Sequence, residues 1–173
     1  TVFMNELKIP QAAAKMTLGQ VSDVVFLMLL PWLLVRLGVK GILLIGMAAW
    51  ALRFGLFAWF DQSRDAAWML FVGIAVHGMC YDYIFVMGRM YVDQRATADI
   101  RGAAQGFHAF VTLGAGMFVG SWLSGVVGQH YTTGGGATHA WQSIWLIPAV
   151  MSAVMIGAFA VLFKERTDSR PSS

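Results

Sequence analysis

Residues 66–87 read AAWMLFVGIAVHGMCYDYIFVM, a long apolar run that contains one carboxylate, Asp82. A run of this length is sufficient to cross the hydrocarbon core of a bilayer, roughly 30 Å thick, as an α-helix. A charged side chain at that depth costs about 2.5–3.5 kcal/mol on insertion scales, so such residues usually face a polar cavity, pair with a partner, or carry protons and substrate. This segment therefore predicts a membrane-spanning helix that carries a functional site.

The whole chain has the composition of a membrane protein. Of its 173 residues, 58% are hydrophobic and 12% are charged, and the mean hydropathy is +0.64. A soluble domain of this size could not bury so many apolar side chains. Apolar runs of spanning length occur at residues 12–34, 41–60, 66–87, 103–127 and 141–163. Because a helix satisfies its own backbone hydrogen bonds in lipid, we predict an all-α membrane protein with five complete transmembrane helices.

The distribution of Lys and Arg predicts the orientation of these helices. One side of the predicted bundle carries most of the basic residues of the loops and the tail: Arg36, Lys40, Arg89, Arg95, Arg101, Lys164, Arg166 and Arg170. The other side carries Lys8, Lys15 and Arg64. The positive-inside rule makes the richer side cytoplasmic, so we expect residues 164–173 to form a disordered cytoplasmic tail. The net charge of +3 follows from this bias and calls for no nucleic-acid partner.

Two polar residues lie near the middle of the first predicted span. Gln20 and Asp23 are three residues apart and therefore share one face of a helix. The amide of Gln20 both donates and accepts hydrogen bonds, and the carboxyl of Asp23 adds acceptors, so the pair suits a ligand with hydroxyl groups. The alternative is that Asp23 only joins neighbouring helices by a hydrogen bond.

The third predicted span carries a second set of candidate residues. His77, Tyr81 and Phe85 recur at intervals of four, and Asp82 lies on the same broad face. Aromatic rings that can stack on a flat ligand, next to a carboxyl that can anchor a polar edge, are typical of a binding pocket. An interhelical hydrogen bond explains His77 equally well, and plain packing explains Phe85. Asp82 instead indicates proton binding, because a carboxyl removed from water can gain and lose a proton.

The remaining intramembrane residues do not predict enzymatic chemistry. Arg53 and His108 could each pair with a carboxyl, and Arg53 could instead extend toward the membrane surface. Cys80 is expected to pack as a small apolar residue. An embedded enzyme would need a nucleophile, a metal cluster or an oriented base, and the five-residue spacing of His77 and Asp82 places them on poorly aligned faces. We therefore predict no catalytic residue, no metal site and no cofactor.

Charged residues also cluster at the predicted cytoplasmic end of the third and fourth spans. Opposite charges recur there at intervals of about four residues, at Arg89, Asp93, Arg95, Asp99 and Arg101. These charges could close an inner gate, and a solvated face with exposed ion pairs is the more ordinary interpretation.

Three motifs carry a resemblance to a known family. They are HGMCYDY at residues 77–83, YVD at residues 91–93 and RGAAQG at residues 101–106. Together they resemble the nucleoside:proton symporter family of the major facilitator superfamily, and the resemblance runs from the first residue to about Phe163. It implies that residues 1–163 form the C-terminal half of a twelve-helix carrier, with a truncated first helix and with the N-terminal half of the same chain missing.

The basic turn between the first two predicted spans resembles the same superfamily in part. Residues 31–40 read PWLLVRLGVK, in which Arg36, Gly38 and Lys40 agree with the turn found in each half of these carriers. Val35 stands where that motif usually has an acid, and Pro31 where it usually has glycine.

The resemblance also implies roles for individual residues. Gln20 and Asp23 match a Gln-x-x-acid pair, and Tyr81 and Asp82 match an aromatic-Asp pair, that are implicated in nucleoside binding and proton coupling. We therefore predict a multi-pass protein of the bacterial inner membrane that imports a nucleoside together with a proton by alternating access. A proton-coupled carrier of sugars or other small polyols would use the same architecture, and an embedded enzyme or a structural subunit is less well supported.

Overall fold

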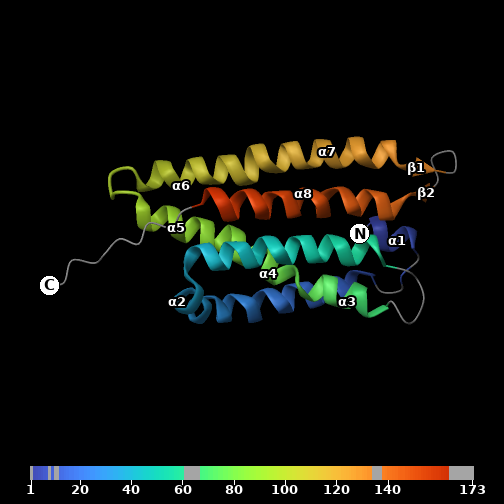
Figure 1. Cartoon of the computed structure of the whole chain (residues 1–173), viewed down its shortest axis with the longest axis horizontal. Coiled ribbons are helices and arrows are strands. Elements are labelled where there is room, and N and C mark those ends of the chain that lie inside the picture. Colours follow the sequence, from blue (N-terminus) through green and yellow to red (C-terminus); the bar gives the residue numbers. More distant parts are fainter. Residues whose placement is uncertain (1, 8, 10–11, 61–66, 134–137, 164–173) are drawn as a thin grey trace.

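A computed structural model describes residues 2–7, 9, 12–60, 67–133 and 138–163. Its long helices run side by side along the longest axis of the molecule (Figure 1). Four helical segments of the described residues are long and apolar enough to cross a membrane: Thr17–Ala58, Trp68–Arg95, Arg101–His130 and Trp141–Leu162. The predicted tail, residues 164–173, lies outside the described residues.

The first of these segments contains two of the predicted spans. Helix α2, Ala12–Ala58, has 47 residues and a break at Gly38, where φ is 66° and ψ is 179°. A straight helix of that length would extend about 70 Å, more than twice the hydrocarbon thickness of a bilayer. Glycine adopts positive φ without steric cost, so the chain reverses here into two arms that run back along one another (Figure 1). We call residues 12–37 the first arm and residues 39–58 the second arm. The described residues thus make five passes.

The third and fourth passes are built from several helical pieces. The third comprises α3 (Ala67–Ala75), α4 (His77–Tyr81), the π-helical turn η2 (Asp82–Val86) and α5 (Met87–Arg95). The fourth comprises α6 (Arg101–Ala109), the π-helical turn η3 (Phe110–Gly116) and α7 (Met117–His130). The third pass extends eight residues beyond the predicted end of its apolar run. Single π-helical turns inside α-helices are rare and frequently occur at functional sites.

The ends of the fold add short elements. Helix α1, Val2–Glu6, lies near β1 and β2 in Figure 1, and α8, Trp141–Leu162, is the fifth pass. Strands β1 (Thr132–Thr133) and β2 (Thr138–His139) form an antiparallel pair, whereas only helices are predicted from the sequence. The carboxylate of Glu6 accepts hydrogen bonds at 2.8 Å from the backbone N–H and the Nδ1 of His139, which ties α1 to this strand pair.

Two clusters of buried side chains form the core of the described part of the chain. One lies near α1 and contains Phe3, Met4, Phe57, Leu70 and Ile74. The other lies near the reversal at Gly38 and contains Leu30, Val39, Ile42, Tyr83 and Met87. The first cluster joins α1 and the second arm of α2 to the third pass. The second cluster joins both arms of α2 to the third pass. No described residue of α6, η3, α7 or α8 is buried, so these helices present apolar surface outward.

The predicted charged cluster forms a corner between α5 and α6. Asp93 pairs with Arg101 across the turn, with 3.5 Å between Oδ1 and Nε, rather than with a residue four positions away as the spacing predicts. Both side chains are about half exposed, and such surface pairs contribute roughly 0–1 kcal/mol. Gln105 strengthens the corner, because its Nε2 donates to the carbonyl of Arg89 at 2.9 Å.

Candidate functional site

The site is built where the first arm of α2 crosses α4. A Cβ atom added to Gly78 would lie 2.6 Å from both Cα and N of Asp23, so only glycine permits the observed approach. The hydroxyl of Ser22 donates to the carbonyl of Gly19 at 2.6 Å and accepts from the backbone N–H of Gly78 at 3.3 Å. This crossing holds the predicted residues of the first and third spans next to one another.

Ser22 and Gly78 were not predicted as site residues, and their roles can be tested by stability. Ser22→Ala should lower the free energy of unfolding by about 1 kcal/mol, because it removes a buried hydrogen bond between two helices. Ser152→Ala is the matched control, since its hydroxyl bonds only within α8, to the carbonyl of Pro148. Thermal unfolding of the purified protein measures both variants. Equal effects of the two substitutions would contradict a bridging role for Ser22.

Two carboxyls, one at this crossing and one directly after α4, have oxygens that lack hydrogen-bond partners among the described residues. Asp82 is 5% exposed and begins the η2 turn, and Asp23 is partly buried. Among the described residues, neither Oδ2 of Asp82 nor Oδ1 of Asp23 has a hydrogen-bond partner, and both atoms are buried. An unpaired buried polar group costs about 1–3 kcal/mol, so these oxygens are suited to take up a proton or a ligand donor.

Arg53 and His77 form the second polar part of the site. Nη1 of Arg53 donates a hydrogen bond to Nδ1 of His77, and this pair replaces the carboxyl partner that the sequence analysis considered for Arg53. The guanidinium also lies over two aromatic rings, 5.4 Å from the centroid of Phe57 and 5.8 Å from that of Trp50.

A cavity of about 220 Å³ adjoins this pair. Gln20, Arg53 and His77 line it together with aromatic side chains that include Phe57 and Trp145. Of the four main predicted site residues, Gln20 lines this cavity, and Asp23, Tyr81 and Asp82 are not among its lining residues.

The aromatic residues of the third pass lie on one face, as their spacing predicts. The ring of Tyr81 is 6.5 Å from that of His77 and 4.8 Å from that of Phe85, measured between centroids. Tyr81 is 42% exposed, which leaves its ring available for stacking. His77 thus connects the aromatic face to the cavity that contains Gln20.

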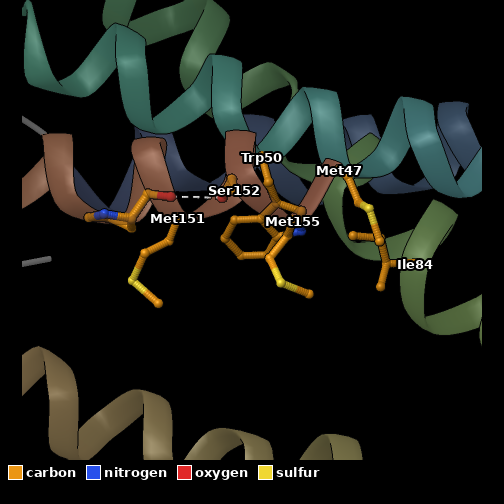
Figure 2. A pocket seen from close by; sticks show the side chains of 7 residues that line it. Met47, Trp50, Ile84, Met151, Ser152 and Met155 are labelled. Atoms are coloured by element: carbon orange, nitrogen blue, oxygen red, sulfur yellow. Dashed lines mark hydrogen bonds between the residues drawn. The ribbon is translucent and has the colours of Figure 1, made fainter. Parts of the chain in front are cut away.

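A different kind of cavity lies between the second arm of α2, η2 and α8. Figure 2 shows the side chains that surround its volume of about 270 Å³: Met47, Trp50, Ile84, Met151, Ser152 and Met155. The hydroxyl of Ser152 already bonds the carbonyl of Pro148 at 2.8 Å, and the indole N–H of Trp50 bonds the carbonyl of Cys80 at 3.0 Å. This cavity therefore offers an apolar surface rather than directed polar groups.

Spanning helices with buried ionisable residues at their crossing are typical of a multi-pass membrane protein that carries a functional site within its spans. The model of the nucleoside H+ symporter family matches residues 2–168, and this chain belongs to that family. The predicted family is thereby confirmed.

Curated relatives with similar sequences include three proteins of Escherichia coli strain K12. The chain is 33% identical to the nucleoside permease NupG over 163 residues, which cover 94% of this chain and 38% of that protein. It is 33% identical to the putative nucleoside transporter YegT, covering 94% and 40% of the two chains, and 31% identical to the xanthosine permease, covering 96% and 39%. The chain thus spans about two fifths of the length of these relatives.

Solved structures are also similar to this fold. The crystal structure of the nucleoside transporter NupG matches with a TM-score of 0.80 and 32% identity, covering 92% of this chain and 41% of that one. The structure of a point variant of NupG matches with a TM-score of 0.84 and 31% identity, covering 94% and 42%. These matches confirm the predicted fold class, an all-α membrane protein with the helical bundle of the major facilitator superfamily.

Proposed function

We propose that this chain forms the C-terminal half of a secondary transporter that imports nucleosides together with protons by alternating access. The observation that carries the proposal is the pair of carboxyls Asp23 and Asp82, each with a buried oxygen that lacks a hydrogen-bond partner among the described residues, in a membrane protein of this family. Transport rather than enzymatic catalysis is in keeping with relatives that are named as permeases and transporters. We assign no catalytic residue and no cofactor.

We propose the following division of roles at the site. Gln20 and Asp23 hold the ribose hydroxyls, because both can accept hydrogen bonds and Gln20 can also donate. The ring of Tyr81 stacks on the base. Asp82, together with Asp23, binds the proton, because a neutral carboxyl is far less costly than a charged one inside the membrane. His77, Phe85 and Arg53 are accessory residues.

Proton uptake then couples to the change of conformation. With both the proton and the nucleoside bound, the two carboxyls no longer carry two uncompensated charges, so the site can close and reopen toward the cytoplasm. Release of both ligands restores the charges and favours return to the outward-facing state. The remaining cavity wall comes from the N-terminal half of the same chain, and the protein resides in the bacterial inner membrane with its C-terminus in the cytoplasm.

Vesicles that contain the full-length protein test this function. An inward proton gradient should drive accumulation of labelled uridine, and a proton ionophore should abolish it. A gradient of one pH unit supports about a tenfold accumulation when one proton accompanies each nucleoside, because a factor of ten corresponds to about 1.4 kcal/mol.

A competition experiment separates nucleosides from other substrates. Excess unlabelled nucleoside should block uptake, whereas excess hexose should have no effect. Uptake of a sugar without uptake of any nucleoside would favour the sugar or polyol carrier.

A further inference from the structure

The hydrogen bond between Arg53 and His77 determines where the imidazole carries its proton. Arginine has only N–H donors, so Nδ1 of His77 must accept the bond from Nη1 of Arg53. An imidazole whose Nδ1 accepts is neutral and carries its hydrogen on Nε2. The pair therefore makes Nε2 of His77 a hydrogen-bond donor.

Arg53 is itself held in place by its surroundings. Its guanidinium lies over the rings of Phe57 and Trp50, at 5.4 and 5.8 Å from their centroids. The indole of Trp50 is in turn fixed by its hydrogen bond to the carbonyl of Cys80. A cation–π contact stabilises by roughly 0.5–2 kcal/mol, depending on its exposure to water. Arg53 is thus a restrained donor in the second arm of α2.

The other side of the imidazole faces the first arm of α2. A Cβ atom added to Gly19 would lie in ordinary van der Waals contact with His77, 3.5 Å from both its Cβ and its Cδ2, so this edge of the imidazole lies next to Gly19. The imidazole is therefore held between the two arms, with Nδ1 on Arg53 and its Cδ2 edge next to Gly19. Gln20, which follows Gly19, lines the same cavity as His77.

We propose that Arg53 is a positioning residue that fixes His77 as a hydrogen-bond donor to a ribose hydroxyl oxygen of the substrate. This inference rests on the proposed function. The shared cavity of about 220 Å³ is smaller than the roughly 300–1,000 Å³ of pockets that enclose a whole drug-sized ligand, so it accommodates part of a nucleoside. Without Arg53, the neutral imidazole would also populate the tautomer in which Nε2 accepts a hydrogen bond. The protein would then discriminate less between nucleosides that carry this hydroxyl and nucleosides that lack it.

Binding of matched deoxynucleosides tests the proposal. Uridine, 2′-deoxyuridine and 3′-deoxyuridine are titrated against the full-length protein in lipid nanodiscs. For one of the two analogues, loss of the hydroxyl should raise Kd by about tenfold in the unmodified protein. In His77→Phe and in Arg53→Met, the same loss should raise Kd by less than about threefold, because the fixed donor is gone.

Conservative and control variants separate positioning from folding. Arg53→Lys retains a donor for Nδ1 and should restore most of the tenfold discrimination, even where overall binding is weaker. Arg36→Met removes an exposed arginine that lies 4.7 Å from the ring of Trp32 and should leave the discrimination unchanged. Arg53→Met with weaker binding but unchanged discrimination would overturn the proposal.

Nitrogen-15 NMR of the imidazole provides a readout that does not require substrate. In protein labelled at histidine, the His77 signals, identified by their absence in His77→Phe, should show a protonated Nε2 and an unprotonated Nδ1. Arg53→Met should give a mixture of tautomers. A protonated Nδ1 in the unmodified protein would overturn the inference alone, whereas failure to bind any nucleoside would overturn the proposed function as well.

Discussion

Replacing Asp82 with asparagine should abolish proton-driven accumulation of nucleoside and leave nucleoside binding largely intact. Asparagine has nearly the same shape as aspartate but cannot gain or lose a proton, and Asp82 is 5% exposed with an unpartnered Oδ2 in the described structure. Under an inward gradient of one pH unit, the accumulation ratio of labelled uridine should fall from about ten to about one. Exchange of labelled for unlabelled uridine across the vesicle membrane should continue, because it requires no net proton movement.

The control for this experiment is an exposed acid, Asp99, which lies in the turn that follows the third pass. Asp99→Asn changes an exposed carboxyl between α5 and α6 and should retain accumulation at the level of the unmodified protein. Accumulation by Asp82→Asn equal to that of the control would rule out the assigned role of Asp82. Loss of both accumulation and exchange would instead indicate that the carboxylate is needed for binding or for folding.

Replacing Gly78 with valine should destabilise the protein strongly and move the first arm of α2 away from α4. The added Cβ would lie 2.6 Å from backbone atoms of Asp23, and backbone cannot move aside as a flexible side chain can. Overpacking in a close-packed interior costs about 1–3 kcal/mol and occasionally more, and this contact belongs at the upper end of that range. We expect a lower midpoint of thermal unfolding and a loss of transport that exceeds the loss caused by Ser22→Ala.

A glycine in open surroundings supplies the control. A Cβ added to Gly157 in α8 meets no atom within 4 Å among the described residues. Gly157→Ala should therefore leave stability unchanged or raise it slightly, because alanine favours a helix over glycine by about 1 kcal/mol. If Gly78→Val unfolds at the same temperature as Gly157→Ala, the close crossing of the two helices is not required for stability.

The membrane-spanning runs could be predicted because they depend on local properties of the chain. Length and hydropathy suffice to identify a helix that satisfies its own backbone in lipid, and the fold class and family inferred from these runs and motifs are confirmed. The reversal at Gly38 agrees with the predicted boundary between the first two spans. The common face of His77, Tyr81 and Phe85 likewise follows from helical spacing alone.

Other features depended on which helices meet and could not be predicted. Arg53 bonds His77 rather than a carboxyl, Asp93 pairs across a turn, and a strand pair forms in the connection before α8. Each involves the relative placement of separate segments, about which hydropathy carries no information. The roles of Gln20, Asp23, Tyr81 and Asp82 in transport remain predictions.

The amino-acid sequence was sufficient to establish a helical membrane protein of this family and to identify the carboxyls within its spans, because burial in lipid and helical periodicity act along a single segment. The tertiary structure alone established the crossing at Gly78, the hydrogen bond of Ser22 and the hydrogen bond between Arg53 and His77. These arise from contacts between residues of different passes, whose distances and directions are set only when the helices pack.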